Sequence, residues 1–181
     1  TLDGTLFPYT TLFRSLGAMF SNFSETTSIR LNGIDPTAED AAAPGLRTRI
    51  IDGGREGSLV GPGQILIPDL IAKGMKVKVG DTVVLVATNR DGSVNGKNFT
   101  VRGVLEPVTG PGGRDGYVHE DDARELLRME EPEAMEIAIR LHDLAKLDKV
   151  EASLAERLEK LTNKDGKIGR ASCRERVYHP V

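Results

Sequence analysis

The residues best suited to chemistry gather at the start of a predicted helix. His119, Glu120, Asp121 and Asp122 place one imidazole and three carboxylates side by side. A metalloprotease helix needs a second histidine four residues after the first, and position 123 is alanine. Acids in a first helical turn are favoured by the helix dipole, whereas a metal site needs ligands from more than one element. We therefore expect a solvated helix start here and no metal site.

A glycine-rich loop, TGPGGRDG, lies within residues Pro107–Gly116. A phosphate-binding loop leads from a strand into a helix N-terminus, whereas this loop leads to the short apolar pair Tyr117–Val118. Nucleotide binding is therefore the weaker alternative, and a surface loop or partner contact is favoured. The apolar surroundings of Ile65–Met75 are a second candidate contact. The predicted partner-contact residues of the loop are Gly110, Pro111, Gly112, Gly113, Arg114 and Asp115.

Composition excludes several classes of function. The 181 residues carry a net charge of −3, which argues against a nucleic-acid partner. The one cysteine, Cys173, provides neither a disulfide framework nor a cysteine-based metal site. No apolar run reaches the roughly 18 residues that a membrane span needs. His142 ends a predicted strand without a nucleophile or acid patterned to it, so we predict no catalytic residue and no cofactor.

The predicted elements centre on Gly63–Glu106. Gln64–Ile67 is an apolar strand, Pro68 is expected at the first position of a helix over Asp69–Lys73, and Gly74 is expected to end that helix. The next segment alternates valine and leucine with polar residues around Gly80–Asp81, which predicts two strands joined by a turn. Asp91–Gly92 and Asn95–Gly96 are predicted turns. The strand expected to return from them contains Phe99, Val101, Val104 and Leu105.

Strands and helices alternate over the rest of the chain. Asp35 can cap a helix that begins with Pro36. The apolar stripe of the last helix has helical spacing. The whole order predicts an α+β fold with a mixed β-sheet and packed helices. The remaining expected elements are a strand over 26–33, a helix over 37–43, a helical turn within 44–52, a loop over 53–63, a helix over 119–129, a strand over 136–141 and a helix over 143–161.

Both ends of the chain lack a clean pattern. Residues 1–15 (TLDGTLFPYTTLFRS) scatter apolar side chains, and residues 168–181 (IGRASCRERVYHPV) are abruptly basic. Both resemble the conceptual translation of sequencing-adapter DNA, and real disordered termini are the alternative. We expect two non-native tails around a domain of residues 16–167, so Cys173, His179 and the nearby arginines carry no function.

Four segments, in order, resemble one family. They are SIRLNGIDPTAED, ILIPDLIAKGMKVKVGDTVVLVATNRDGSVNGKNFTVRGVLE, YVHEDDARELL and EIAIRL with the long helix that follows. The chain resembles the extracytoplasmic domain of bacterial permeases of the lipoprotein-releasing, MacB-like and FtsX-like type. The family's Leu-Gly after the short helix is Gly74-Met75 here. Its membrane helices, one before the domain and three after it, are absent, as expected if both ends are cut.

The resemblance implies a function. The intact protein would be a permease subunit of an ABC transporter in the bacterial cytoplasmic membrane, with this domain on the extracytoplasmic, periplasmic side. A separate cytoplasmic ATPase subunit would hydrolyse ATP, and a second permease protomer would pair through the missing membrane helices. The domain would transmit motion to a lipoprotein, drug or peptide, and a periplasmic carrier would be a further candidate partner. It would not itself be an enzyme.

Two alternatives stay open from the residues alone. The first is a soluble small-molecule-binding or accessory β-module, since KVKVGDTVVL is typical of many small β-modules. The second is an enzyme, which would need convergent titratable groups that His119, His142, Asp121 and Asp122 do not supply by pattern. Flanking membrane-spanning sequence would favour the permease over the soluble module.

Overall fold

The structure is a computed structural model that describes residues 9–89, 91–129, 136–141 and 143–158. Contacts divide the chain into a larger unit, Tyr9–Ile139, and a second unit that includes Arg140 and the residues after it. His142, Cys173 and His179, for which the sequence predicts no function, lie outside the described part.

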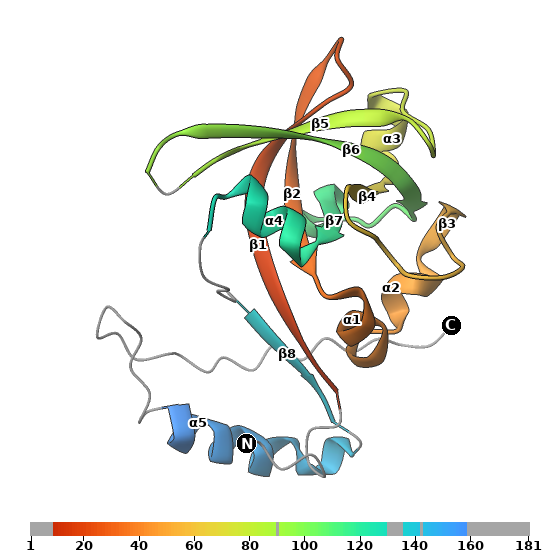
Figure 1. Cartoon of the computed structure of the whole chain (residues 1–181). Helices are drawn as coiled ribbons and strands as arrows, with labels where there is room; N and C mark the ends of the chain where they lie inside the picture. The colour runs from red at the N-terminus through yellow and green to blue at the C-terminus, as the bar shows by residue number, and fades with distance from the viewer. Residues whose placement is uncertain (1–8, 90, 130–135, 142, 159–181) are drawn as a thin grey trace. The chain divides into compact units, whose positions relative to one another are not determined.

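The larger unit is built on strands that close into a ring (Figure 1). Going round the ring, β1 pairs with β2, β2 with β7, β7 with β4, β4 with β6, β6 with β5, and β5 again with β1. The β2–β7 and β4–β6 pairs are parallel and the other four are antiparallel. The ring strands are β1 (Tyr9–Ser21), β2 (Thr26–Ile34), β4 (Gln64–Pro68), β5 (Thr82–Thr88), β6 (Val94–Leu105) and β7 (Asp115–His119).

Two further strands attach to this ring. The short strand β3 (Ile50–Gly53) pairs antiparallel with the end of β6. Strand β8 (Glu136–Arg140) lies beside β1. The sheet is mixed and carries helices, which confirms the α+β prediction.

Alternating side chains give the sheet two buried faces. In β1, Leu16, Ala18 and Phe20 are buried while Met19 between them is half exposed, because successive side chains of a strand point to opposite faces. The main core continues through β2, β4, β5 and β6 to the helices α3 (Asp69–Gly74) and α4 (Glu120–Leu126). A second cluster lies on the other face, where Leu66 and Tyr117 pack with Leu46 of helix α2 (Gly45–Thr48).

Short helices cover the ring. Helix α1 (Pro36–Ala42) begins as predicted, because the Asp35 carboxylate accepts hydrogen bonds from the N–H groups of Thr37 and Ala38. Helix α4 (Glu120–Leu126) contacts β1, β2, β6 and β7 and turns Ala123 and Leu126 into the main core. The other helices of this unit are α2 (Gly45–Thr48), α3 (Asp69–Gly74) and the 3₁₀ turn η1 (Pro111–Arg114).

The second unit contains the 3₁₀ turn η2 (Leu144–Lys146) and helix α5 (Leu147–Leu158). A helix was predicted over 143–161, and positions 159–161 lie outside the described residues. The start of the prediction is wrong by one 3₁₀ turn. Val150 of the predicted apolar stripe is buried.

Several predicted element boundaries are wrong. Residues 77–79 are not a strand, although their alternation suggested one, because Val77 closes the end of α3 and Val79 is partly exposed. Asn95–Gly96 is no turn but lies within β6. Positions 50–53 form β3 rather than helix.

The limits of α3 also differ from the prediction. Pro68 has extended backbone and ends β4 instead of opening the helix. Gly74 belongs to the helix, and Lys76 adopts the left-handed conformation that glycine usually provides after a helix.

Candidate functional site

The predicted partner-contact loop is an ordered turn. Pro111–Arg114 forms η1 between β6 and β7, and the N–H of Gly113 donates to the carbonyl of Gly110 at 3.0 Å. Gly110 has a φ of 96°, in the region that favours glycine. Gly113 is buried, and a Cβ added to it would lie 2.6 Å from the carbonyl oxygen of Val108. Two of these glycines are therefore required by the shape of the turn.

The two charged residues of this loop bind strand β2. Arg114 Nη1 donates to the carbonyl oxygen of Ser28 at 3.0 Å and to Thr27 Oγ1 at 3.1 Å. Asp115 accepts both a 2.5 Å bond from Arg30 Nε and a 2.5 Å bond from Arg30 Nη2. A paired geometry of this kind is strong and directional. These charges have a structural role in fixing η1 to β2, and a partner contact by the loop stays a prediction.

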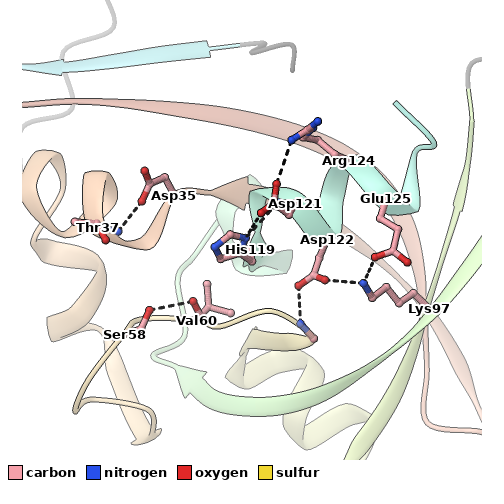
Figure 2. Close-up of polar contacts among 11 residues, drawn as sticks. Asp35, Thr37, Ser58, Val60, Lys97, His119, Asp121, Asp122, Arg124 and Glu125 are labelled. Atoms are coloured by element: carbon pink, nitrogen blue, oxygen red, sulfur yellow. Dashed lines mark hydrogen bonds and ion pairs between the residues drawn. The ribbon is translucent and has the colours of Figure 1, made fainter. Parts of the chain in front are cut away.

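The acidic residues at the start of α4 point in different directions (Figure 2). His119 caps the helix, since its Nδ1 accepts from the N–H of Asp121 at 3.3 Å. Asp121 is exposed and accepts from Arg124 Nη1 at 3.1 Å. Asp122 is buried and faces the ring. The acids therefore do not converge on one point.

Asp122 joins three segments of the fold. One carboxylate oxygen accepts from Lys97 Nζ of β6 at 2.7 Å, and the other accepts from the N–H of Gly63, just before β4, at 2.7 Å. Glu125, one turn further along α4, also binds the Lys97 ammonium group (Figure 2). A buried carboxylate with these partners fixes α4 against the ring.

Burial alone would lower the pKa of Lys97, but its hydrogen bonds with Asp122 and Glu125 outweigh that effect and raise the pKa above its ordinary value. Lys97 therefore stays protonated and acts as a fixed positive charge. Sequence reasoning missed it, because Lys97 follows the wrongly predicted Asn95–Gly96 turn and stands far from Asp122 in the chain. An alternation starting from Phe99 would have placed Lys97 on the same side of β6 as Phe99.

Within the described ranges, no three His, Cys, Asp or Glu side chains are grouped so that they could hold a metal ion. None of the helices described is both long and apolar enough to cross a bilayer. The polar groups reported above hold elements of the fold together.

Comparison with known proteins gives the family. Residues 8–157 match the model of the MacB-like periplasmic core domain. No curated protein matches the chain. The periplasmic region of MacB from Actinobacillus actinomycetemcomitans has 16% identity and a TM-score of 0.57, over 86% of this chain and 67% of that one.

A second solved structure has the same fold. The extracellular domain of the noncanonic ABC-type transporter YknZ from Gram-positive bacteria has 16% identity and a TM-score of 0.60, over 84% of this chain and 75% of that one. At such identity the two structures support the fold, while the family match spans most of the chain. The chain therefore belongs to the MacB-like periplasmic core domains of ABC transporter permeases.

Proposed function

We propose that this domain transmits ATP-driven motion from the membrane part of a permease subunit to substrate outside the cytoplasmic membrane. The observation that carries the proposal is the position of the two strands that bound the larger unit. The unit begins with β1 and ends with β8, and these strands are hydrogen-bonded neighbours. Strand β1 also pairs with β2 and β5. A displacement at this boundary is therefore passed directly to the ring.

The proposal includes partners and location. ATP is hydrolysed by a separate cytoplasmic subunit, a second permease protomer faces this one, and the domain lies on the periplasmic side of a bacterial cytoplasmic membrane. The cargo is a lipoprotein, drug or peptide, and a periplasmic carrier is a further candidate partner. Membership of the family supports the general assignment.

An insertion in the full-length permease tests the coupling. Four Gly and Ser residues placed between the preceding membrane helix and Leu16 should leave ATP hydrolysis and membrane insertion intact but abolish transport, because a flexible linker absorbs the displacement. The matched control places the same insertion at Asp91–Gly92, in the loop between β5 and β6, where loops tolerate added residues. Transport that survives the first insertion would contradict the proposed coupling.

We also propose that residues 1–15 and 168–181 are non-native and that the domain itself comprises residues 16–167. The first boundary falls inside β1, whose alternating buried side chains begin at Leu16. Sequencing outward from the encoding DNA tests this. Reading frames that continue into membrane-spanning segments on both sides of 16–167 are expected, and a native gene with the present ends would contradict it.

A further inference from the structure

The tip of the β1–β2 hairpin is a rigid surface feature. Four residues, Asn22 to Glu25, join the paired positions Ser21 and Thr26. Asn22 Oδ1 accepts from the N–H groups of Ser24 at 3.0 Å and Glu25 at 2.7 Å. The N–H of Phe23 donates to Ser21 Oγ at 3.2 Å. These bonds hold the loop in one conformation.

The tip presents an aromatic side chain in an unfavourable backbone conformation. Phe23 has a φ of 72°, a region that Gly and Asn adopt far more readily than Phe. Its side chain is 68% exposed, the highest value among the large apolar residues of the described chain. The local sequence therefore gains neither backbone stability nor burial from this ring. Strained residues held by their surroundings are concentrated at functional sites.

A second residue of the same kind lies beside the tip. Asn22 Nδ2 donates to the carbonyl oxygen of Met75 at 2.8 Å, which fastens the hairpin to the end of α3. Lys76, the next residue, is exposed and has a φ of 53°. Lys73 and Lys78, on either side in the sequence, are also exposed. Phe23 directly follows one end of this hydrogen bond in the chain, Lys76 directly follows the other end, and Lys78 is two residues further on, whereas the Lys73 ammonium group is paired with Asp69 at 2.8 Å.

We propose that this surface, formed by Phe23 with Lys76 and Lys78, docks a protein partner that has an apolar socket for the ring and carboxylates around it. An exposed aromatic side chain on a rigid loop suits a binding hot spot, because burying it costs little conformational entropy. The lysines select an acidic surface by charge complementarity.

The position of the tip favours a protein over a bilayer. The tip follows the end of β1, and the native part of that strand, residues 16–21, separates the tip from the strand's native start by about 17 Å at about 3.3 Å per residue. In Figure 1 the hairpin extends beyond β5, at the opposite end of β1 from its first residue. This step rests on the proposed function, in which the membrane lies at the start of β1.

Direct binding by the complete 181-residue chain tests the docking surface. The probe is a fluorescein-labelled peptide of alternating Leu and Glu, and fluorescence anisotropy reports its dissociation constant. Phe23→Asn should weaken binding at least tenfold while raising the urea midpoint, because Asn tolerates the left-handed backbone. Lys76→Gly should also weaken binding and raise the midpoint. A variant that binds the peptide more weakly but unfolds at a higher urea concentration has lost a contact with the peptide and has not misfolded.

The matched control is Val94→Ala, because Val94 is 63% exposed at the start of β6 and lies away from this surface in the chain. It should leave peptide affinity unchanged. The same peptide with Lys in place of Glu should not bind. Failure of the Glu peptide to bind, or binding that Phe23→Asn leaves intact, would overturn the proposal.

Two further arms identify a different occupant. Binding to vesicles of phosphatidylglycerol and phosphatidylethanolamine that Phe23→Asn abolishes would make the surface a lipid contact and overturn the protein assignment. Self-association that the same substitution abolishes would make a second copy of the chain the occupant. None of these measurements requires ATP or transport, so they fail independently of the proposed coupling.

Discussion

Lys76 and Arg128 occupy equivalent positions after two different helices. Each has a positive φ. In each case the N–H of the next residue donates to a carbonyl oxygen of the preceding helix, Val77 to Ala72 at 2.9 Å and Met129 to Arg124 at 3.0 Å. This hydrogen-bond pattern is a common helix ending in which glycine normally holds the left-handed position. Both helices therefore end with a side chain that the backbone disfavours.

Replacing either residue with glycine should stabilise the protein. Lys76→Gly and Arg128→Gly should each raise the free energy of unfolding by about 1 kcal/mol, because glycine adopts the left-handed conformation without a Cβ clash. Urea denaturation measures the change. A loss of stability on both substitutions would show that the side chains make stabilising contacts that exceed the backbone cost.

Of the residues of α4, Asp122 is the one whose loss should destabilise the protein most. Asp122→Ala should cost about 2–3 kcal/mol, because it leaves the Gly63 N–H and the Lys97 ammonium group short of a partner. Asp121→Ala is the control on the same turn; it is exposed and should change stability by less than about 1 kcal/mol. Equal effects of the two substitutions would refute the assigned role of Asp122.

The raised pKa of Lys97 predicts a pH dependence at the alkaline end. Burial opposes the charge, and the bonds to Asp122 and Glu125 raise the folded pKa above the ordinary 10.5. The stabilisation is therefore complete below pH 10.5 and is lost as the pH rises through the folded value. As the pH rises above 10.5, the free energy of unfolding should fall more steeply for the native chain than for Lys97→Met. Parallel curves would show that Lys97 gains nothing from its partners.

At the scale of elements, the glycine-rich loop is an ordered turn whose shape depends on particular glycines. Gly113→Ala should destabilise the protein by about 1–3 kcal/mol, because the new Cβ would lie 2.6 Å from a backbone oxygen. Gly112→Ala is the matched control, since its nearest contact would be an ordinary 3.5 Å from Asp115 Oδ2. Thermal unfolding compares them. Equal melting temperatures for the two variants would mean that the backbone of the turn shifts at little cost to accommodate the added Cβ.

Elements with a strong local signal were predictable. The Asp35–Pro36 start of α1 and the alternation in β2 and β6 follow from residue types alone. Val77 shows why the prediction failed for other segments. An apolar residue next to lysines also occurs where the chain leaving a helix directs one side chain into the core. Periodicity cannot separate that case from a short strand.

At the scale of the whole molecule, family membership and the mixed sheet were predictable, but closure of the ring was not. Closure depends on β1 meeting β5, with Phe20 opposite Leu85, and such a distant pairing leaves no local pattern. The Lys97–Asp122 contact was missed for the same reason. A closed ring leaves its strands with few free edges for unwanted pairing.

The closed ring has a consequence for the newly made chain. The β1–β2 hairpin is synthesised early, but its Leu16 and Phe20 reach their final neighbours only after β5 has been made. Until β5 has been made, the edge of β1 that will pair with it is exposed, and chains with an exposed apolar strand edge tend to associate wrongly. Folding should therefore be slow, because the β1–β5 pairing and the still more distant β2–β7 pairing must both form before the ring closes, and a helper protein that shields β1 during synthesis should raise the yield.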